Sequence, residues 1–118
     1  MGKRFIIAAD FGTGGLTLGL FNRHTKRMVD FGSGSYGELA GLQTGYVEHD
    51  PRHWISAFVE AMDDLRRRTD FDVDDIAAIA ASGHMHAGTF LGEDNEPLLE
   101  NGQLLQGSIT WDDIRGPE

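Results

Sequence analysis

The chain has 118 residues, no cysteine and a formal net charge of −9, and 40% of its residues are apolar. This composition predicts one modest globular domain, because the length is too short for two. The acidic balance excludes nonspecific nucleic-acid binding, which needs a basic face, and no apolar run is long enough to cross a membrane. Without cysteine a disulfide framework is excluded, and a cytoplasmic location is expected.

The first part of the chain predicts a β-hairpin around a glycine-rich turn. Apolar runs at residues 5–9 and 16–21 flank the segment DFGTGG at residues 10–15. Glycines let the backbone approach an anion closely, and successive N–H groups can point at its oxygens. Asp10, at the end of the first strand, is placed to hold a metal ion or its bound water beside phosphates. The alternative is an ordinary hairpin turn that contains a carboxylate.

The middle of the chain predicts a third strand and then a helix. Residues 28–31, continuing toward Tyr36, complete an antiparallel meander, whereas residues 32–49 are rich in glycine and predict a loop with some extended structure. Asp50 and Pro51 indicate a helix start, with Asp as the N-cap and Pro at the first helical position. Its apolar face is expected to contain residues three or four positions apart, namely Trp54, Phe58, Met62 and Leu65, with Ile55 and Val59 beside them.

The last third predicts a parallel strand followed by a polar loop. Residues 76–81 are uniformly apolar, as is typical of a buried parallel strand, and SGHMHAG follows at residues 82–88. Ligands in α/β sheets bind at the carboxyl ends of such strands, so this loop and the Asp10 turn would face one cleft if their strands are parallel neighbours. His84 and His86 could line a site, lie at the surface or bind zinc. A turn is expected at residues 93–95 and a last strand at 108–111.

Four motifs occur in order along the chain: DFGTGG at residues 10–15, VEHDP followed by Trp54, GHMH at residues 83–86 and WDDIR at residues 111–115. Together they resemble the N-terminal part of the FGGY carbohydrate kinases, and GHMH is most similar to the xylulokinase motif. The resemblance implies an α/β, ribonuclease H-like fold of the actin/hexokinase/Hsp70 type. In it, an antiparallel meander is followed by a helix and then a parallel strand. Residues 1–118 would be the N-terminal portion of the first kinase domain, with the second domain and the catalytic base beyond Glu118.

The resemblance also implies ATP-dependent phosphorylation of a sugar hydroxyl, with ATP and Mg²⁺ as cofactors. Such transfer depends mainly on positioning and on neutralising the phosphates. By analogy, Asp10 would hold Mg²⁺ through water. The terminal phosphates would be contacted by Gly12, Thr13 and Gly14.

On the substrate side, the resemblance implies a sugar or polyol, most similar to a ketopentose such as xylulose. Met85 and His86 would line the sugar site, and Trp111 would supply an apolar wall against the sugar carbons. Whether the chain forms a homodimer is left open by the resemblance. For Trp111 the alternative is packing in the core, whereas core packing is favoured for Trp54.

Several positions depart from the family pattern. Gly14 stands where a second Thr or Ser is usual, Thr17 where Lys or Arg is common, and His84 where Gln is usual. Backbone contacts to phosphate survive the first two changes. A second hypothesis is therefore a non-catalytic ATP- or sugar-binding module derived from a kinase lobe, and a third is a structural domain without a site. Asp113 and Arg115 are expected to form a structural ion pair.

Overall fold

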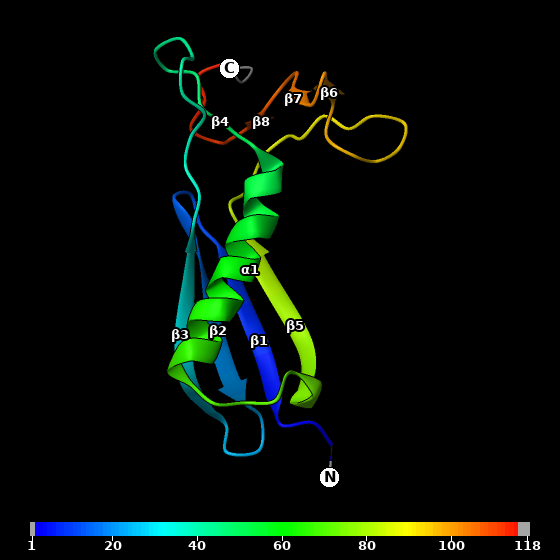
Figure 1. Cartoon of the computed structure of the whole chain (residues 1–118). Coiled ribbons are helices and arrows are strands. Elements are labelled where there is room, and N and C mark those ends of the chain that lie inside the picture. Colours follow the sequence, from blue (N-terminus) through cyan, green and yellow to red (C-terminus); the bar gives the residue numbers. More distant parts are fainter. Residues whose placement is uncertain (1, 116–118) are drawn as a thin grey trace.

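A four-stranded sheet forms the centre of the computed structural model, which describes residues 2–115 (Figure 1). Three strands form an antiparallel meander: β1 (Phe5–Phe11), β2 (Gly15–Asn22) and β3 (Arg27–Ser35). The fourth strand, β5 (Ile76–Gly83), runs parallel to β1, and the order across the sheet is β3-β2-β1-β5. The predicted meander followed by a parallel strand is therefore confirmed.

Helix α1 (Pro51–Arg68) crosses one face of this sheet and begins where the sequence predicts (Figure 1). The Asp50 carboxylate accepts the backbone N–H of Arg52 at 3.0 Å, which satisfies one of the free donors of the first turn. The predicted apolar face is partly wrong. Ile55 and Val59 are 67% and 56% exposed, and the buried positions are Ala57, Ala61 and Leu65.

Two glycines of β3 explain why small residues face the sheet. A Cβ atom built on Gly34 would lie 2.0 Å from the carbonyl oxygen of Ala57, and one on Gly32 would lie 2.3 Å from that of Ala61. The helix backbone thus lies directly against the backbone of β3, and glycine at these two positions of the strand permits the close approach. Both glycines lie in β3, which continues through Ser35 as the predicted extension toward Tyr36 requires, so the predicted loop begins after this strand and not at residue 32.

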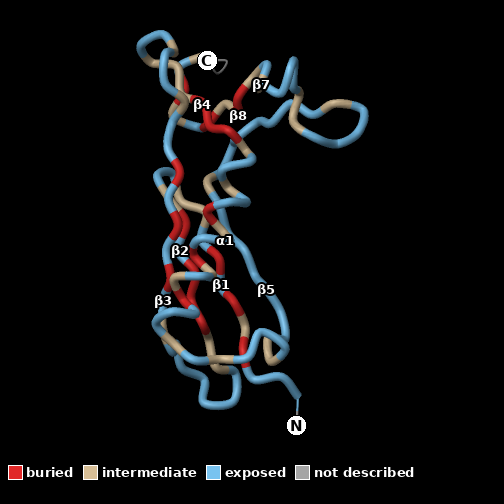
Figure 2. The backbone as a smooth tube through the Cα atoms, viewed as in Figure 1, coloured by how far each residue is buried: buried red, intermediate tan, exposed pale blue. Residues whose placement is uncertain are grey.

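The core lies between α1 and the meander, where buried side chains alternate along the strands (Figure 2). Ile7 and Ala9 of β1 and Leu16, Leu18 and Leu20 of β2 point toward the helix. The expected burial of β5 is wrong in the described chain, since residues 77–83 are exposed. The helix packs mainly on β2 and β3, and β5 lies at the edge of the sheet.

Short elements gather beyond the first turn of α1 (Figure 1). Strand β4 (Glu48–His49) pairs with β8 (Ser108–Ile109), which confirms the first half of the predicted last strand. A small hairpin of β6 (Leu99–Glu100) and β7 (Gln103–Leu104) was not predicted, whereas the turn at residues 93–95 was. No helix among residues 2–115 combines the length and apolar character needed to cross a bilayer.

Candidate functional site

The turn between β1 and β2 is built to leave backbone donors free. The N–H of Gly12 donates to the carbonyl oxygen of Gly15 at 2.9 Å and closes the turn. The N–H groups of Thr13 and Gly14 have no acceptor within the described residues, and a Cβ on Gly14 would meet nothing within 4 Å. Two unpaired donors on an open, glycine-rich turn fit an anion such as a phosphate group.

Asp10 lies beside this turn on the face of the sheet that α1 leaves open. It pairs across the sheet with Thr17 of β2 and Ser82 of β5, so the three side chains share one face. The Ser82 hydroxyl is 3.5 Å from a carboxylate oxygen of Asp10, which is otherwise exposed. Among residues 2–115 no three His, Cys, Asp or Glu side chains cluster to hold a metal. An exposed carboxylate beside free backbone donors fits a hydrated magnesium ion, which Asp10 would hold through water.

A pocket of about 380 Å³ joins this turn to the loop that follows β5. Its lining residues are Thr13, Gly83, His84, Met85, His86 and Trp111. Because β1 and β5 are parallel neighbours, the two loops face one cleft, as the sequence predicted. Of the predicted site residues, Thr13, Met85, His86 and Trp111 are therefore brought together.

Trp111 reaches the turn between β1 and β2 from the far end of the chain. Its side chain is half-exposed, at 58%, so the alternative of core packing is excluded. The indole N–H donates to the Thr13 hydroxyl oxygen at 3.3 Å, which places the ring as one wall of the pocket. Met85 is 72% exposed, and His86 has a left-handed backbone with φ of 59°. Such backbone is uncommon outside glycine and is often found at functional sites.

Tyr36 also holds the turn, although the sequence predicted only that it lies near the end of a strand. Its hydroxyl is in hydrogen-bonding contact with the carbonyl oxygen of Gly12 and lies 3.1 Å from that of Gly15. Burial, and to a lesser extent the nearby Asp10 carboxylate, raises the pKa of Tyr36. The phenol therefore keeps its proton at neutral pH and acts as a donor.

His84 fastens the loop that follows β5 to the same turn. Its backbone N–H donates to the carbonyl oxygen of Phe11 at 2.9 Å, and its ring Nδ1 lies 3.3 Å from the carbonyl oxygen of Gly12. The ring packs edge-on against Trp54, with centroids 5.3 Å apart. The alternative of two surface histidines is therefore wrong for His84, which is partly buried, while His86 is exposed.

His49 backs this arrangement and was missed at the sequence level. It is 1% exposed, and its Nδ1 accepts the indole N–H of Trp54 at 3.4 Å. Its ring lies edge-on to His84, with centroids 5.7 Å apart. Burial, and next the proximity of His84, lowers the pKa of His49, so this ring is neutral. Its remaining nitrogen, Nε2, has no hydrogen-bond partner among the described residues. A histidine directly before the Asp-Pro helix start was the available signal.

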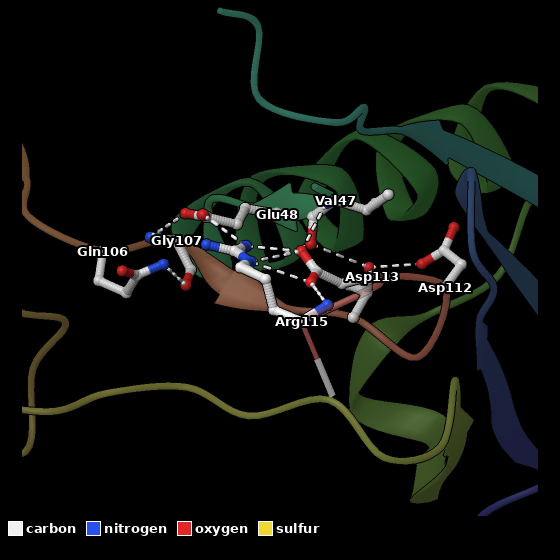
Figure 3. Close-up of polar contacts among 8 residues, drawn as sticks. Val47, Glu48, Gln106, Gly107, Asp112, Asp113 and Arg115 are labelled. Carbon is white, nitrogen blue, oxygen red and sulfur yellow. Dashed lines mark hydrogen bonds and ion pairs between the residues drawn. The ribbon is translucent and has the colours of Figure 1, made fainter. Parts of the chain in front are cut away.

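An ionic cluster of Glu48, Asp113 and Arg115 lies just after Trp111 in the sequence (Figure 3). The Arg115 guanidinium lies 2.6 Å from an Asp113 carboxylate oxygen and 2.8 Å from one of Glu48, so the predicted ion pair is confirmed. Asp113 also accepts the N–H of Val47 at 2.7 Å. Hydrogen bonds from Arg115 hold the pKa of the Asp113 carboxyl well below its usual range. The segment that carries Trp111 is thus tied to β4.

Comparisons with known proteins agree with the motifs. The model of the FGGY family of carbohydrate kinases, N-terminal domain, matches residues 5–117. A xylulose kinase from Bacillus subtilis is 28% identical over 112 residues, which are 95% of this chain and 21% of that protein. A glycerol kinase from Symbiobacterium thermophilum is 30% identical over 94% of this chain and 21% of its own length. The structure of a xylulose kinase from Lactobacillus acidophilus matches with a TM-score of 0.71 and 33% identity, over 92% of this chain and 20% of that chain.

These matches establish the fold class: the domain is α/β and ribonuclease H-like, of the actin/hexokinase type. The chain spans about a fifth of the length of the curated relatives that it matches.

Proposed function

The chain belongs to the FGGY family of carbohydrate kinases, and from that premise we propose that it takes part in ATP-dependent phosphorylation of a sugar or polyol hydroxyl. Residues 1–118 would be the N-terminal portion of the first kinase domain and would supply the phosphate turn and part of the sugar site. The observation that carries this proposal is the shared pocket, in which Thr13 of the phosphate turn lies with Met85, His86 and Trp111.

On the ATP side, the free N–H groups of Thr13 and Gly14 would bind phosphate oxygens, and Gly12 would shape the turn that presents them. Asp10 would contact Mg²⁺ through water, and the ion would neutralise phosphate charge during transfer. Thr17 supplies no positive charge beside Asp10, so backbone donors and the metal would carry the neutralisation.

On the sugar side, His86 would donate or accept a hydrogen bond with a sugar hydroxyl. Met85 would make an apolar contact with the sugar, and Trp111 would pack against the carbon face of its ring. The Met-His pair and the xylulose kinase relatives favour a ketopentose such as xylulose. No carboxylate is among the described residues that line this pocket, so we propose that the catalytic base comes from outside residues 2–115.

A second candidate is a binding module without turnover. The absence of a hydroxyl at Gly14 and of a basic side chain at Thr17 favours it, since both changes remove contacts to phosphate. Such a module would bind Mg-ATP or sugar at the same pocket and release no ADP.

The test is ADP release by the longest polypeptide that the gene encodes, incubated with Mg-ATP and a panel of ketoses and polyols. We expect sugar-stimulated release, greatest with a ketopentose, and a fall of about 100-fold in Asp10→Asn. The matched control is His24→Gln, an exposed change in the turn at the opposite end of the sheet. Sugar binding without ADP release would support the module instead. Absence of both would reject the proposed function.

A further inference from the structure

We infer that His84 couples the two halves of this site, so that sugar in the pocket strengthens the binding of Mg-ATP at the phosphate turn. The inference rests on the proposed function and assigns a positioning role to a residue that need not touch either reacting group. It follows from what His84 contacts on each side.

Two hydrogen bonds join the sugar-side loop to the phosphate turn through this one residue. The His84 N–H donates to Phe11 at 2.9 Å, and Nδ1 lies 3.3 Å from the carbonyl oxygen of Gly12. Because a carbonyl oxygen accepts, Nδ1 must carry the proton. Together with the Tyr36 hydroxyl, that bond holds the peptide immediately before Thr13, whose N–H is one of the two free donors for phosphate, and of the two contacts only the one from His84 comes from the sugar-side loop.

The imidazole is held in that orientation from behind. Trp54 and His49 both pack edge-on against it, and the buried His49 is fixed in turn by the indole N–H of Trp54. The ring therefore has little freedom to turn away from Gly12 while its own loop stays in place. A change in the loop is passed to the turn through a rigid ring rather than a flexible side chain.

The residues that follow His84 line the sugar-side pocket. Met85 and His86 are exposed and make no side-chain hydrogen bond within the described residues, so a ligand would be what orders them. Ordering this loop would hold His84 on Gly12 and would lower the cost of ordering the turn around phosphate. Thermodynamic linkage requires the reverse as well: bound Mg-ATP must strengthen sugar binding by the same factor.

The experiment measures this factor directly by calorimetry on the longest polypeptide that the gene encodes. The probes are Mg²⁺ with the non-hydrolysable analogue adenosine 5′-(β,γ-imido)triphosphate, titrated with and without saturating D-xylulose. In the wild type we expect saturating sugar to lower the Kd of the ATP analogue about fivefold, which is the contribution of one hydrogen bond. His84→Phe keeps the edge-on packing but has no donor, and it should reduce the factor to about one. His84→Asn has an amide nitrogen the same number of bonds from Cα as Nδ1, so it offers a donor and should preserve the factor, as should the distant control His24→Gln.

Melting curves first establish that each variant is folded. If His84→Phe is not, His84→Leu serves in its place, because it also has no donor for the Gly12 carbonyl oxygen. A fivefold factor that persists in the donor-less variant overturns the inference, and so does a wild-type factor of one in a protein that phosphorylates sugar. A wild type that neither binds nor phosphorylates any sugar overturns the proposed function together with the inference.

Discussion

Replacing Gly34 by alanine should disrupt the close contact between the backbones of α1 and β3. The added Cβ atom would lie 2.0 Å from the carbonyl oxygen and 2.7 Å from the carbonyl carbon of Ala57. Both obstacles are backbone atoms, so no rotamer change relieves the clash. To reach an ordinary contact of 3.4 Å, the helix backbone must move by about 1.4 Å away from β3.

The free-energy cost of that shift follows from the packing it disturbs. Overpacking of a close-packed interior costs about 1–3 kcal/mol, and a clash with backbone belongs at the upper end. The helix buries Ala57, Ala61 and Leu65 against the strands, and all three would lose contact together. We expect about 3 kcal/mol of destabilisation, or a melting temperature lower by on the order of 10 °C.

Thermal unfolding followed by tryptophan fluorescence measures this loss. The matched control is Gly37→Ala, because a Cβ at Gly37 would meet nothing within 4 Å. The control should melt within about 2 °C of the wild type. If Gly34→Ala melts with the control, the close approach of helix and strand is refuted.

Two further predictions concern Tyr36 and Asp113. Tyr36→Phe removes the hydroxyl that holds Gly12, so calorimetry with the ATP analogue should show about fivefold weaker binding with the fold intact; unchanged affinity would contradict this role. The pKa of Asp113 is lowered in the folded state by Arg115, so its contribution to stability is present above about pH 4 and is lost as the pH falls below that value. The melting temperature of the wild type should therefore decrease as the pH falls below about 4. The melting temperature of Asp113→Asn should be lower than that of the wild type near pH 7, and the two should converge in acid. Parallel curves would argue against the linkage.

Local sequence patterns predicted most of the main elements of the fold. The apolar runs at residues 5–9 and 16–21 predicted β1 and β2, and the Asp50-Pro51 pair predicted the residue at which α1 begins. What failed depends on neighbours that periodicity cannot reveal. Ile55 and Val59 lie on a helical stripe, yet the helix turns its alanines to the sheet because β3 offers glycines there. Similarly, the apolar run of β5 predicts burial, but burial depends on what covers the strand.

The candidate site was predictable where a motif names the residue. Asp10, Thr13, Met85, His86 and Trp111 all came from motifs, and the last four meet at one pocket. The residues that hold these groups in place were not recognised, because their role appears after folding. Tyr36 and His49 are distant from the turn in sequence. Tyr36 contacts the turn directly and His49 packs against His84, and no short pattern encodes either contact.

The outer edge of β5 has backbone amides whose hydrogen exchange depends on whether another strand pairs with it. In a parallel pair, alternate residues direct their N–H groups toward one neighbour and the rest toward the other. Along Ile76–Gly83 every second amide therefore bonds to β1, while the intervening amides face a side on which no described strand lies. Hydrogen exchange should be slow and fast in alternation along this strand. In any longer polypeptide or complex, slowing of the fast set alone would mark the moment at which another strand has joined the sheet.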